Sequence, residues 1–296
     1  MRHPNLFVFD IETIPDTEAT ARLLGIGADE LDTQTLRDHL AQYHLEITQG
    51  KNDFPRQPFH RVVAISFLTA EIHRDEENES YVFRELRSGG REDASERDLL
   101  LGFFQHLERI KPRLVTFNGR GFDLPVLKYR AMKHGITASW LHTAGDKWNH
   151  YGHRYSTDWH CDLVEVLSDF GASARVKLNE VCAVFGIPGK METEGADVAA
   201  LYDAGDLAAI RDYCELDVLN TYLVYLRHML HTARITRDAH DQAIDDILAM
   251  IDREGAERPH LTEFRRYWEA ACEGQFRLSQ SSEADGADDA DTAASE

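Results

Sequence analysis

The sequence predicts an α/β fold with additional helices toward its C-terminal end. Short apolar runs typical of buried strands occur at Leu6–Phe9 and within Arg113–Phe117. Helical periodicity lies between and after them, most clearly from Asp206 to Leu230. Strands that alternate with amphipathic helices pack as a sheet covered by helices, and 296 residues suffice for one such domain with additions.

The composition is typical of a soluble protein in a reducing compartment. Hydrophobic residues make up 43% of the chain, and no apolar run reaches the length of a membrane span. The N-terminus lacks the basic and then apolar layout of a signal peptide. The four cysteines show no CxxC spacing, which argues against a zinc ribbon or a disulfide framework. We therefore expect a cytoplasmic protein with no membrane partner.

The net charge of −20 does not favour nucleic-acid binding, because phosphate backbones attract basic surfaces. Six of the acids lie in Ser279–Glu296, and leaving these six out brings the charge from −20 to −14. We expect this segment to be a disordered acidic tail. A metal-dependent nuclease tolerates an acidic surface, because its ions carry positive charge to the phosphate.

The first buried strand is expected to end in the acidic tripeptide Asp10-Ile11-Glu12. Residues i and i+2 of a strand project from one face, so Asp10 and Glu12 should point together while Ile11 turns into the core. Two adjacent anions at the end of a buried strand repel each other, and a divalent cation would supply the missing charge. The alternative is a strand that ends at solvent with two ordinary surface acids.

A polar, helix-prone segment follows between Asp16 and His60, and we interpret it as an insertion between two strands. A plain insertion is the simpler interpretation, and a lid or substrate-gripping role is the alternative. Strands are expected at Arg61–Leu68 and Ser80–Arg84. A helix capped by Ser95, with a broad apolar stripe, should follow and end at Lys111-Pro112.

A further acid follows the next strand. Arg113–Phe117 runs into Asn118-Gly119, which is a turn signal, and a helix should begin at Asp123. Asp123 therefore lies at a helix N-terminus. An ordinary N-cap is the alternative to a metal ligand at this position.

Thr143–Ser156 is an aromatic, histidine-bearing loop without periodicity. Its aromatic rings, with Lys147 and Arg154, could stack on and neutralise single-stranded nucleic acid, and an ordinary surface loop is an equal alternative. The histidine spacing matches no zinc site. A short helix is expected at Leu178–Phe185, closed by Gly186-Ile187-Pro188-Gly189.

The long helix Asp206–Leu230 carries a carboxylate that should point inward. Asp217 falls on a face whose other residues are apolar or small, and Tyr213 lies one turn before it on the same face. A buried Asp usually pairs with a base, but no Lys or Arg lies on that face. Two further helices are expected at about 236–253 and 262–272.

The three segments FDIET, NGRGFD and YCELD, which contain Asp10, Asp123 and Asp217, are far apart in the chain. Their four acids are hard to explain by stability, and such a set can hold two Mg²⁺ or Mn²⁺ ions about 3.5–4 Å apart. The segments resemble the three exonuclease motifs of the DEDD superfamily. Tyr213, four residues before the last aspartate, is the mark of the DEDDy branch.

Two longer stretches, GIPGKMETEGADV at Gly186–Val198 and DYCELDVLNTYLVYLR at Asp212–Arg227, are similar to one family in particular. These are the predicted 3′–5′ exonucleases related to the proofreading domain of family B DNA polymerases. The resemblance spans about residues 5–230.

The resemblance implies a ribonuclease H-like exonuclease fold, with a mixed five-stranded sheet flanked by helices and its first three strands antiparallel. The exonuclease domain would comprise residues 1–230 with an insertion at 16–60. A helical extension at 231–278 and the disordered acidic tail at 279–296 would follow.

The resemblance also assigns roles to the site residues. Asp10 would bridge two divalent cations, Mg²⁺ or Mn²⁺. Glu12 and Asp217 would complete the site of the first ion, and Asp123 would hold the second, partly through water. Tyr213 would orient the attacking water rather than act as a base, because the unperturbed pKa of a tyrosine is about 10.

Asn118 and Phe122 would support the second motif and the terminal nucleotide. The implied reaction is hydrolysis of the 3′-terminal phosphodiester of single-stranded DNA, which releases nucleoside 5′-monophosphates. An exonuclease acting on RNA 3′ ends is an alternative. A catalytically silent module that binds nucleic acid, or a protein partner through its C-terminal helices, is another.

Overall fold

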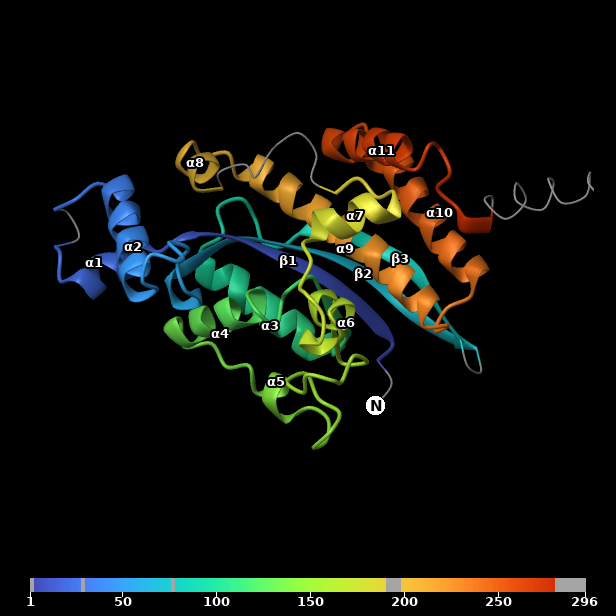
Figure 1. Ribbon diagram of the computed structural model, residues 1–296, viewed down its shortest axis with the longest axis horizontal. Coiled ribbons are helices and arrows are strands. Elements are labelled where there is room, and N and C mark those ends of the chain that lie inside the picture. Colours follow the sequence, from blue (N-terminus) through green and yellow to red (C-terminus); the bar gives the residue numbers. More distant parts are fainter. Residues whose placement is uncertain (1–2, 28–29, 76–77, 190–197, 280–296) are drawn as a thin grey trace, which may run out of the picture.

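The computed structural model describes residues 3–27, 30–75, 78–189 and 198–279, and a five-stranded sheet lies at its centre (Figure 1). The strand order is β3-β2-β1-β4-β5. The strands are β1 (Asn5–Pro15), β2 (His60–Asp75), β3 (Asn78–Ser88), β4 (Arg113–Thr116) and β5 (His160–Asp162). The pairs β1–β2 and β2–β3 are antiparallel, whereas β1–β4 and β4–β5 are parallel. This topology confirms the expected mixed, ribonuclease H-like sheet.

Helices cover both faces of the sheet (Figure 1). The helices on one face are α3 (Glu96–Ile110) and α4 (Asp123–Lys133), and those on the other are α9 (Leu207–His231) and α10 (Arg237–Glu254). Two helices pack on α9 from outside, α7 (Leu178–Phe185) and α11 (Pro259–Ala271). The remaining helices are α1 (Thr17–Leu24), α2 (Thr33–Ile47), α5 (Ser139–Thr143), α6 (Leu163–Leu167) and α8 (Val198–Asp203), with two 3₁₀ turns, η1 (Gln57–Phe59) and η2 (Asp169–Gly171).

The alternation of side chains along β1 separates two apolar clusters. Leu6 and Val8 pack on the side of α9 and α10, whereas Phe7, Phe9 and Ile11 pack on the side of α3 and α4. Residues that follow at steps of two therefore share a face, as expected for a pleated strand. Asp10 and Glu12 continue the line of Leu6 and Val8, so the pleat directs them toward α9.

The prediction that the first strand ends in the tripeptide Asp10-Ile11-Glu12 is wrong. β1 continues to Pro15 because β2 pairs with it along this whole length, with Asp10 opposite Ser66 and Glu12 opposite Ala64. A β-bulge interrupts the register between Glu12 and Thr13. Inter-strand hydrogen bonds hold the charged residues in extended conformation, although Asp alone disfavours a strand.

The insertion at 16–60 contains α1 and α2 and is fixed to the domain by a buried ion-pair cluster. Asp16 caps α1 by accepting a hydrogen bond from the Ala19 N–H at 2.9 Å, and its carboxylate also pairs with Arg130 of α4. Arg130, whose side chain is 2% exposed, also donates to Glu96 of α3 at 2.6 Å. The insertion therefore begins at a fixed position beside α3 and α4.

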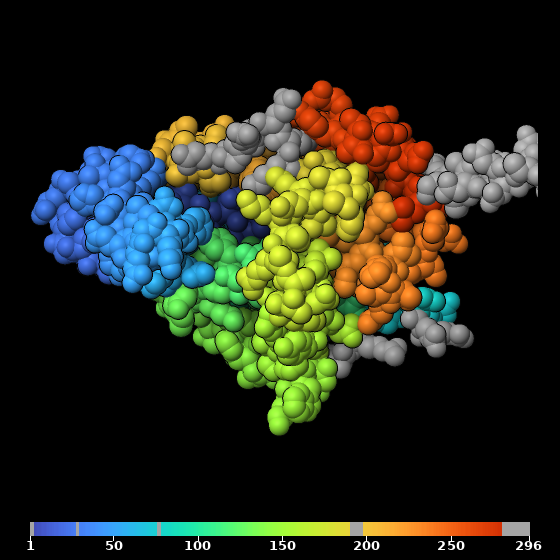
Figure 2. Space-filling model, viewed as in Figure 1, coloured from blue at the N-terminus to red at the C-terminus, as the bar shows by residue number. Residues whose placement is uncertain are grey.

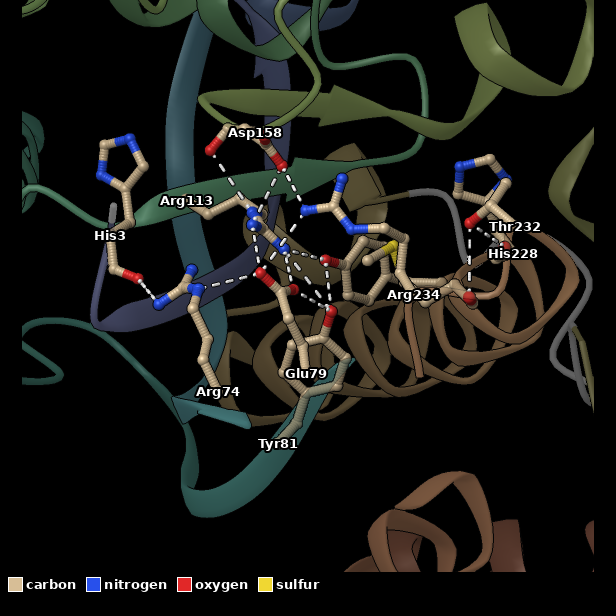
Figure 3. Close-up of polar contacts among 11 residues, drawn as sticks. His3, Arg74, Glu79, Tyr81, Arg113, Asp158, His228, Thr232 and Arg234 are labelled. Carbon is tan, nitrogen blue, oxygen red and sulfur yellow. Dashed lines mark hydrogen bonds and ion pairs between the residues drawn. The ribbon is translucent and has the colours of Figure 1, made fainter. Parts of the chain in front are cut away.

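A second buried ion-pair network lies where β3, β4 and α9 meet (Figure 3). The Arg113 guanidinium donates to Glu79 at 2.6 Å and to the Tyr225 hydroxyl at 3.1 Å. It also donates to Asp158 at 3.0 Å. The network joins strands from the antiparallel and the parallel halves of the sheet, so we assign it a structural role.

The C-terminal helices lie close to their predicted places. α10 begins within a residue of the expected 236, and α11 begins at Pro259, three residues before the expected 262. Within the described residues, no helix combines the length and apolar character needed to cross a bilayer. The predicted disordered tail at 279–296 lies, apart from Ser279, outside the described residues.

Candidate active site

Asp10 and Glu12 lie side by side and face α9, as the sequence predicts. The Cys214 thiol on α9 donates to Asp10 Oδ2 at 3.6 Å. One ligand atom from each of Asp10, Glu12 and Cys214 lies within 4.8 Å of the other two. Both acids are half-buried, so neither is the ordinary surface acid of the alternative interpretation.

Asp123 reaches the same strand from the opposite helix layer. β4 pairs with β1 only as far as Val8, opposite Val115, and the chain then turns away into α4. Beyond this point the Asp123 carboxylate interacts with the backbone N–H of Ile11, and this interaction lowers its pKa. Asp123 is therefore close to the part of β1 that carries Asp10 and Glu12.

Asp123 is not the N-cap of α4. Phe122 occupies that position with φ −132° and makes no side-chain capping bond, so Asp123 is the first residue within the helix. The side chain is 4% exposed, and burial is the main cause that raises its pKa to about 7. A structural cap would gain nothing from such burial.

Tyr213 and Asp217 lie one turn apart on α9, and the tyrosine hydroxyl donates a hydrogen bond to the Asp217 carboxylate. Burial and then repulsion by Asp217, Glu12 and Asp10 raise the Tyr213 pKa above its ordinary value. The hydroxyl therefore keeps its proton at neutral pH and acts as a donor.

The electrostatics of Asp10 connect all four predicted acids. Its pKa lies well above the ordinary value, first because it is buried and then because Asp123, Glu12 and Asp217 repel its negative charge. The Cys214 hydrogen bond opposes this shift. The charges of the four carboxylates therefore act on one another at this site. Carboxylate oxygens are the ligands that hard divalent cations prefer.

The turn before Asp123 is held by a residue that the sequence did not single out. Asp162 of β5 accepts hydrogen bonds from the backbone N–H groups of Asn118 at 2.9 Å and Arg120 at 2.7 Å. Asn118 has a left-handed backbone, with φ 69°. Gly119 is required because a Cβ there would come within 2.5 Å of the Thr116 hydroxyl.

Arg120 also supports this turn. Its guanidinium donates to the carbonyls of Tyr151, His153 and His160, each at 3.1 Å. These bonds join the end of the Thr143–Ser156 loop to the NGRGFD segment that contains Asp123. No local pattern marks Arg120 or Asp162, whereas Cys214 was recognisable from its position on the inward face of α9.

Figure 2 shows where a substrate can approach. The dark-blue N-terminal strand lies at the bottom of a hollow, between the blue insertion on one side and the yellow-green 150–185 segment on the other. Phe122, which was predicted to contact the terminal nucleotide, lies at the insertion side, where its ring meets His60 with centroids 4.9 Å apart. Asn118 lies in the turn that precedes Phe122 in the chain.

A second group of possible metal ligands lies elsewhere on α9. Asp212, Glu215 and His260 place ligand atoms within 4.8 Å of one another. Arg258 pairs with Glu215 at 2.5 Å, and the His260 imidazole bridges Asp212 and Glu215 at 3.1 and 3.0 Å. Positive side chains already balance these acids, so we interpret the group as an ion-pair network that attaches α11 to α9.

The topology of the sheet and the acids on its central strand define a ribonuclease H-like protein of the exonuclease type. A family model described as "predicted 3′–5′ exonuclease related to the exonuclease domain of PolB" matches residues 52–268. The match covers most of the chain, and the chain belongs to this family. The predicted resemblance is thereby confirmed. Membership implies a nucleic-acid substrate and the use of divalent metal ions.

The family match begins after Asp10 and Glu12 and continues through α10 into α11, beyond residue 230. Among solved structures, the chain is similar to the family B DNA polymerase from the hyperthermophilic archaeon Pyrobaculum calidifontis. The sequence identity is 17% and the TM-score 0.42, over 86% of this chain and 29% of the polymerase chain. The chain thus spans less than a third of that polymerase. A search of curated proteins finds no match.

Proposed function

We propose that the protein is a metal-dependent exonuclease that removes nucleoside 5′-monophosphates from the 3′ end of single-stranded DNA. The observation that carries the proposal is that Asp10 and Glu12 project side by side from β1, with ligand atoms within 4.8 Å of each other and of Cys214 on α9. Desolvation, and then the charges of Asp123, Glu12 and Asp217, raise the pKa of Asp10. Two divalent cations would offset the repulsion among these carboxylates.

The roles proposed for the acids are those that the family resemblance implies. Asp10 would contact both ions. Glu12 and Asp217 would complete the coordination of one ion, and Asp123 would serve the second. Bound divalent cations supply positive charge that activates water and stabilises the leaving 3′-oxygen.

Tyr213 would position the attacking water rather than deprotonate it. Its hydroxyl is directed at Asp217 and stays protonated near neutral pH because burial and the neighbouring acids raise its pKa. An oriented donor contributes to catalysis by fixing geometry rather than by taking up a proton. Asn118 would hold the turn before Asp123, and Phe122 would contact the terminal nucleotide.

The test is digestion of a 5′-labelled single-stranded oligonucleotide with and without Mn²⁺. The expected result is progressive shortening from the 3′ end with release of 5′-nucleotides, abolished by Asp10→Asn and by Asp217→Asn. Asp252→Asn on α10 removes the same charge from a side chain that is 66% exposed, and it should leave the rate unchanged. Full activity in the Asp10 and Asp217 variants would refute the proposal.

The same assay shows whether DNA or RNA is the preferred substrate. Matched DNA and RNA strands should show faster release from DNA, and preferential release from RNA would replace the proposal with a 3′-exoribonuclease. Binding without metal-dependent release of nucleotides would instead identify a silent module.

A further inference from the structure

The loop segment from residue 48 to His60, the first residue of β2, is hydrogen-bonded to residues near two of the candidate metal ligands. Gln57 Nε2 donates to the Gly121 carbonyl at 3.1 Å, two residues before Asp123. His60 Nε2 donates to the Pro55 carbonyl at 2.8 Å, and its Nδ1 lies 2.9 Å from Thr13 Oγ1, next to Glu12. The loop is therefore fixed relative to both acids.

The loop carries an exposed aromatic ring at this edge. Phe54 is 55% exposed, and its ring centroid lies 5.0 Å from that of His60 and 5.9 Å from that of Phe122. Phe122 immediately precedes Asp123 in the chain. His60 is buried and Phe122 is half-buried, so these two rings pack against Phe54 from the side of the candidate catalytic acids, and Phe54 projects outward from them.

Basic residues flank the exposed ring. Lys51 and Arg56 are both exposed, and they lie three residues before and two residues after Phe54 in a chain with net charge −20. Aromatic rings between basic side chains are typical of surfaces that bind single-stranded nucleic acid, where bases stack and phosphates are neutralised. The loop also belongs to the insertion that borders the hollow in Figure 2.

We propose that Phe54 is a positioning residue that stacks on the base of the penultimate nucleotide of a single-stranded substrate. The inference rests on the proposed exonuclease function and deepens it. Phe122 lies next to Asp123 and meets the terminal nucleotide, and the base that precedes it along the substrate meets Phe54. A base stacked on Phe54 cannot remain stacked within a duplex, so this contact favours an unpaired 3′ end.

The variant Phe54→Ala tests the contact, because an exposed ring contributes little to folding. Loss of one stacked base should raise KM for a single-stranded oligonucleotide about tenfold and leave kcat unchanged. Phe54→Trp should restore KM. Tyr129→Ala removes another exposed ring, 46% exposed on α4, and should not change KM. Hydrolysis of the p-nitrophenyl ester of thymidine 5′-monophosphate, which has no second base, should not respond to any of these changes.

An oligonucleotide with an abasic penultimate position provides the decisive comparison. Wild type and Phe54→Ala should have equal KM for it, because the base that Phe54 contacts is missing. The same KM of wild type and Phe54→Ala for the normal oligonucleotide would overturn the proposal. So would a tenfold difference that persists on the abasic strand, or a loss of ester hydrolysis in Phe54→Ala, since either result would show that the ring acts through the fold.

The result is separable from failure of the proposed function. Binding of a labelled oligonucleotide in Ca²⁺, measured by fluorescence anisotropy, requires no turnover. If wild type releases no nucleotides, the exonuclease proposal fails, while a weaker affinity of Phe54→Ala that disappears on the abasic strand still supports stacking. Unchanged affinity would overturn the stacking proposal whatever the activity.

Discussion

The Asp123 carboxylate is 4% exposed and interacts with the backbone N–H of Ile11, the residue that separates Asp10 from Glu12 on β1. This interaction joins the start of α4 to the central strand beyond the point at which β4 has turned away. It offsets the effect of burial only in part, so the charged form of the carboxylate remains unfavourable in this position.

We expect Asp123→Asn to stabilise the metal-free protein at high pH. Burial raises the Asp123 pKa from 3.8 to about 7 in the folded state, so folding above pH 7 must keep a carboxylate charged where it is disfavoured. The cost is absent below about pH 4, where the folded and unfolded forms are both protonated, and it grows as the pH rises to 7. The gain in the free energy of unfolding should be at most about 4 kcal/mol at pH 8.

Urea unfolding in EDTA at pH 4 and pH 8 measures this gain, and Asp252→Asn on α10 is the control. With saturating Mn²⁺ the wild type should be more stable than Asp123→Asn, because the wild type binds the cation through Asp123. Equal stabilities of wild type and Asp123→Asn at pH 8 without metal would show that burial of the charged Asp123 carboxylate carries no cost.

Asp162→Asn should lower activity although Asp162 is not a proposed metal ligand. Its Oδ2 accepts the Arg120 N–H at 2.7 Å, and its Oδ1 accepts the N–H groups of Asn118 at 2.9 Å and Val164 at 3.1 Å. An amide NH₂ cannot accept a hydrogen bond, so one buried donor loses its partner at a cost of about 1–3 kcal/mol.

The turn that positions Asp123 would then move, and kcat should fall. Mn²⁺ affinity measured by calorimetry should weaken in parallel. Normal metal affinity and normal kcat in a folded Asp162→Asn protein would show that the turn is held by other contacts.

The features that the sequence predicts correctly are those that depend on local patterns. The inward face of α9 with Tyr213 and Asp217, the helix that begins at Asp123, and the paired projection of Asp10 and Glu12 all follow from periodicity or from one turn signal. Each of these patterns is contained within a few residues, so pairing with distant segments does not alter it.

The features missed depend on partners far away in the chain. β1 extends to Pro15 because β2 pairs with it, and β5 is a three-residue strand, too short to show any period. The contact of Asp162 with Asn118 joins positions more than forty residues apart, and no propensity encodes it. Tertiary pairing decides such elements, and strand propensity is weak beside it.

Tyr213→Phe should lower kcat about 10²-fold and leave KM for the oligonucleotide unchanged. The hydroxyl donates to Asp217, and its pKa is raised by burial and by the neighbouring acids, so its role is orientation of a reacting group. A donor of this kind does not titrate between pH 6 and 9. The pH dependence of kcat should therefore have the same shape in wild type and variant, measured by single-turnover release of the terminal nucleotide. An alkaline limb that is lost in Tyr213→Phe would instead identify the tyrosine as a titrating base.

Glu79→Gln should destabilise the fold and spare the active site. Glu79, 5% exposed, is paired with Arg113, 3% exposed, and removing the charge leaves the buried guanidinium without its main partner, at a cost of about 3–5 kcal/mol (Figure 3).

Although burial opposes it, the hydrogen bonds and attraction of Arg113 lower the Glu79 pKa from 4.5 to about 2. The stabilisation is therefore complete above pH 4.5 and is lost as the pH falls toward 2. Urea unfolding at pH 7 and at lower pH should show a gap between wild type and variant that narrows over this range. Glu71→Gln breaks a pair with Arg84 in which both side chains are more than 40% exposed, and it should leave the stability nearly unchanged at every pH. A gap that stays constant from pH 7 to pH 2 would mean that packing, rather than the ion pair, determines the cost.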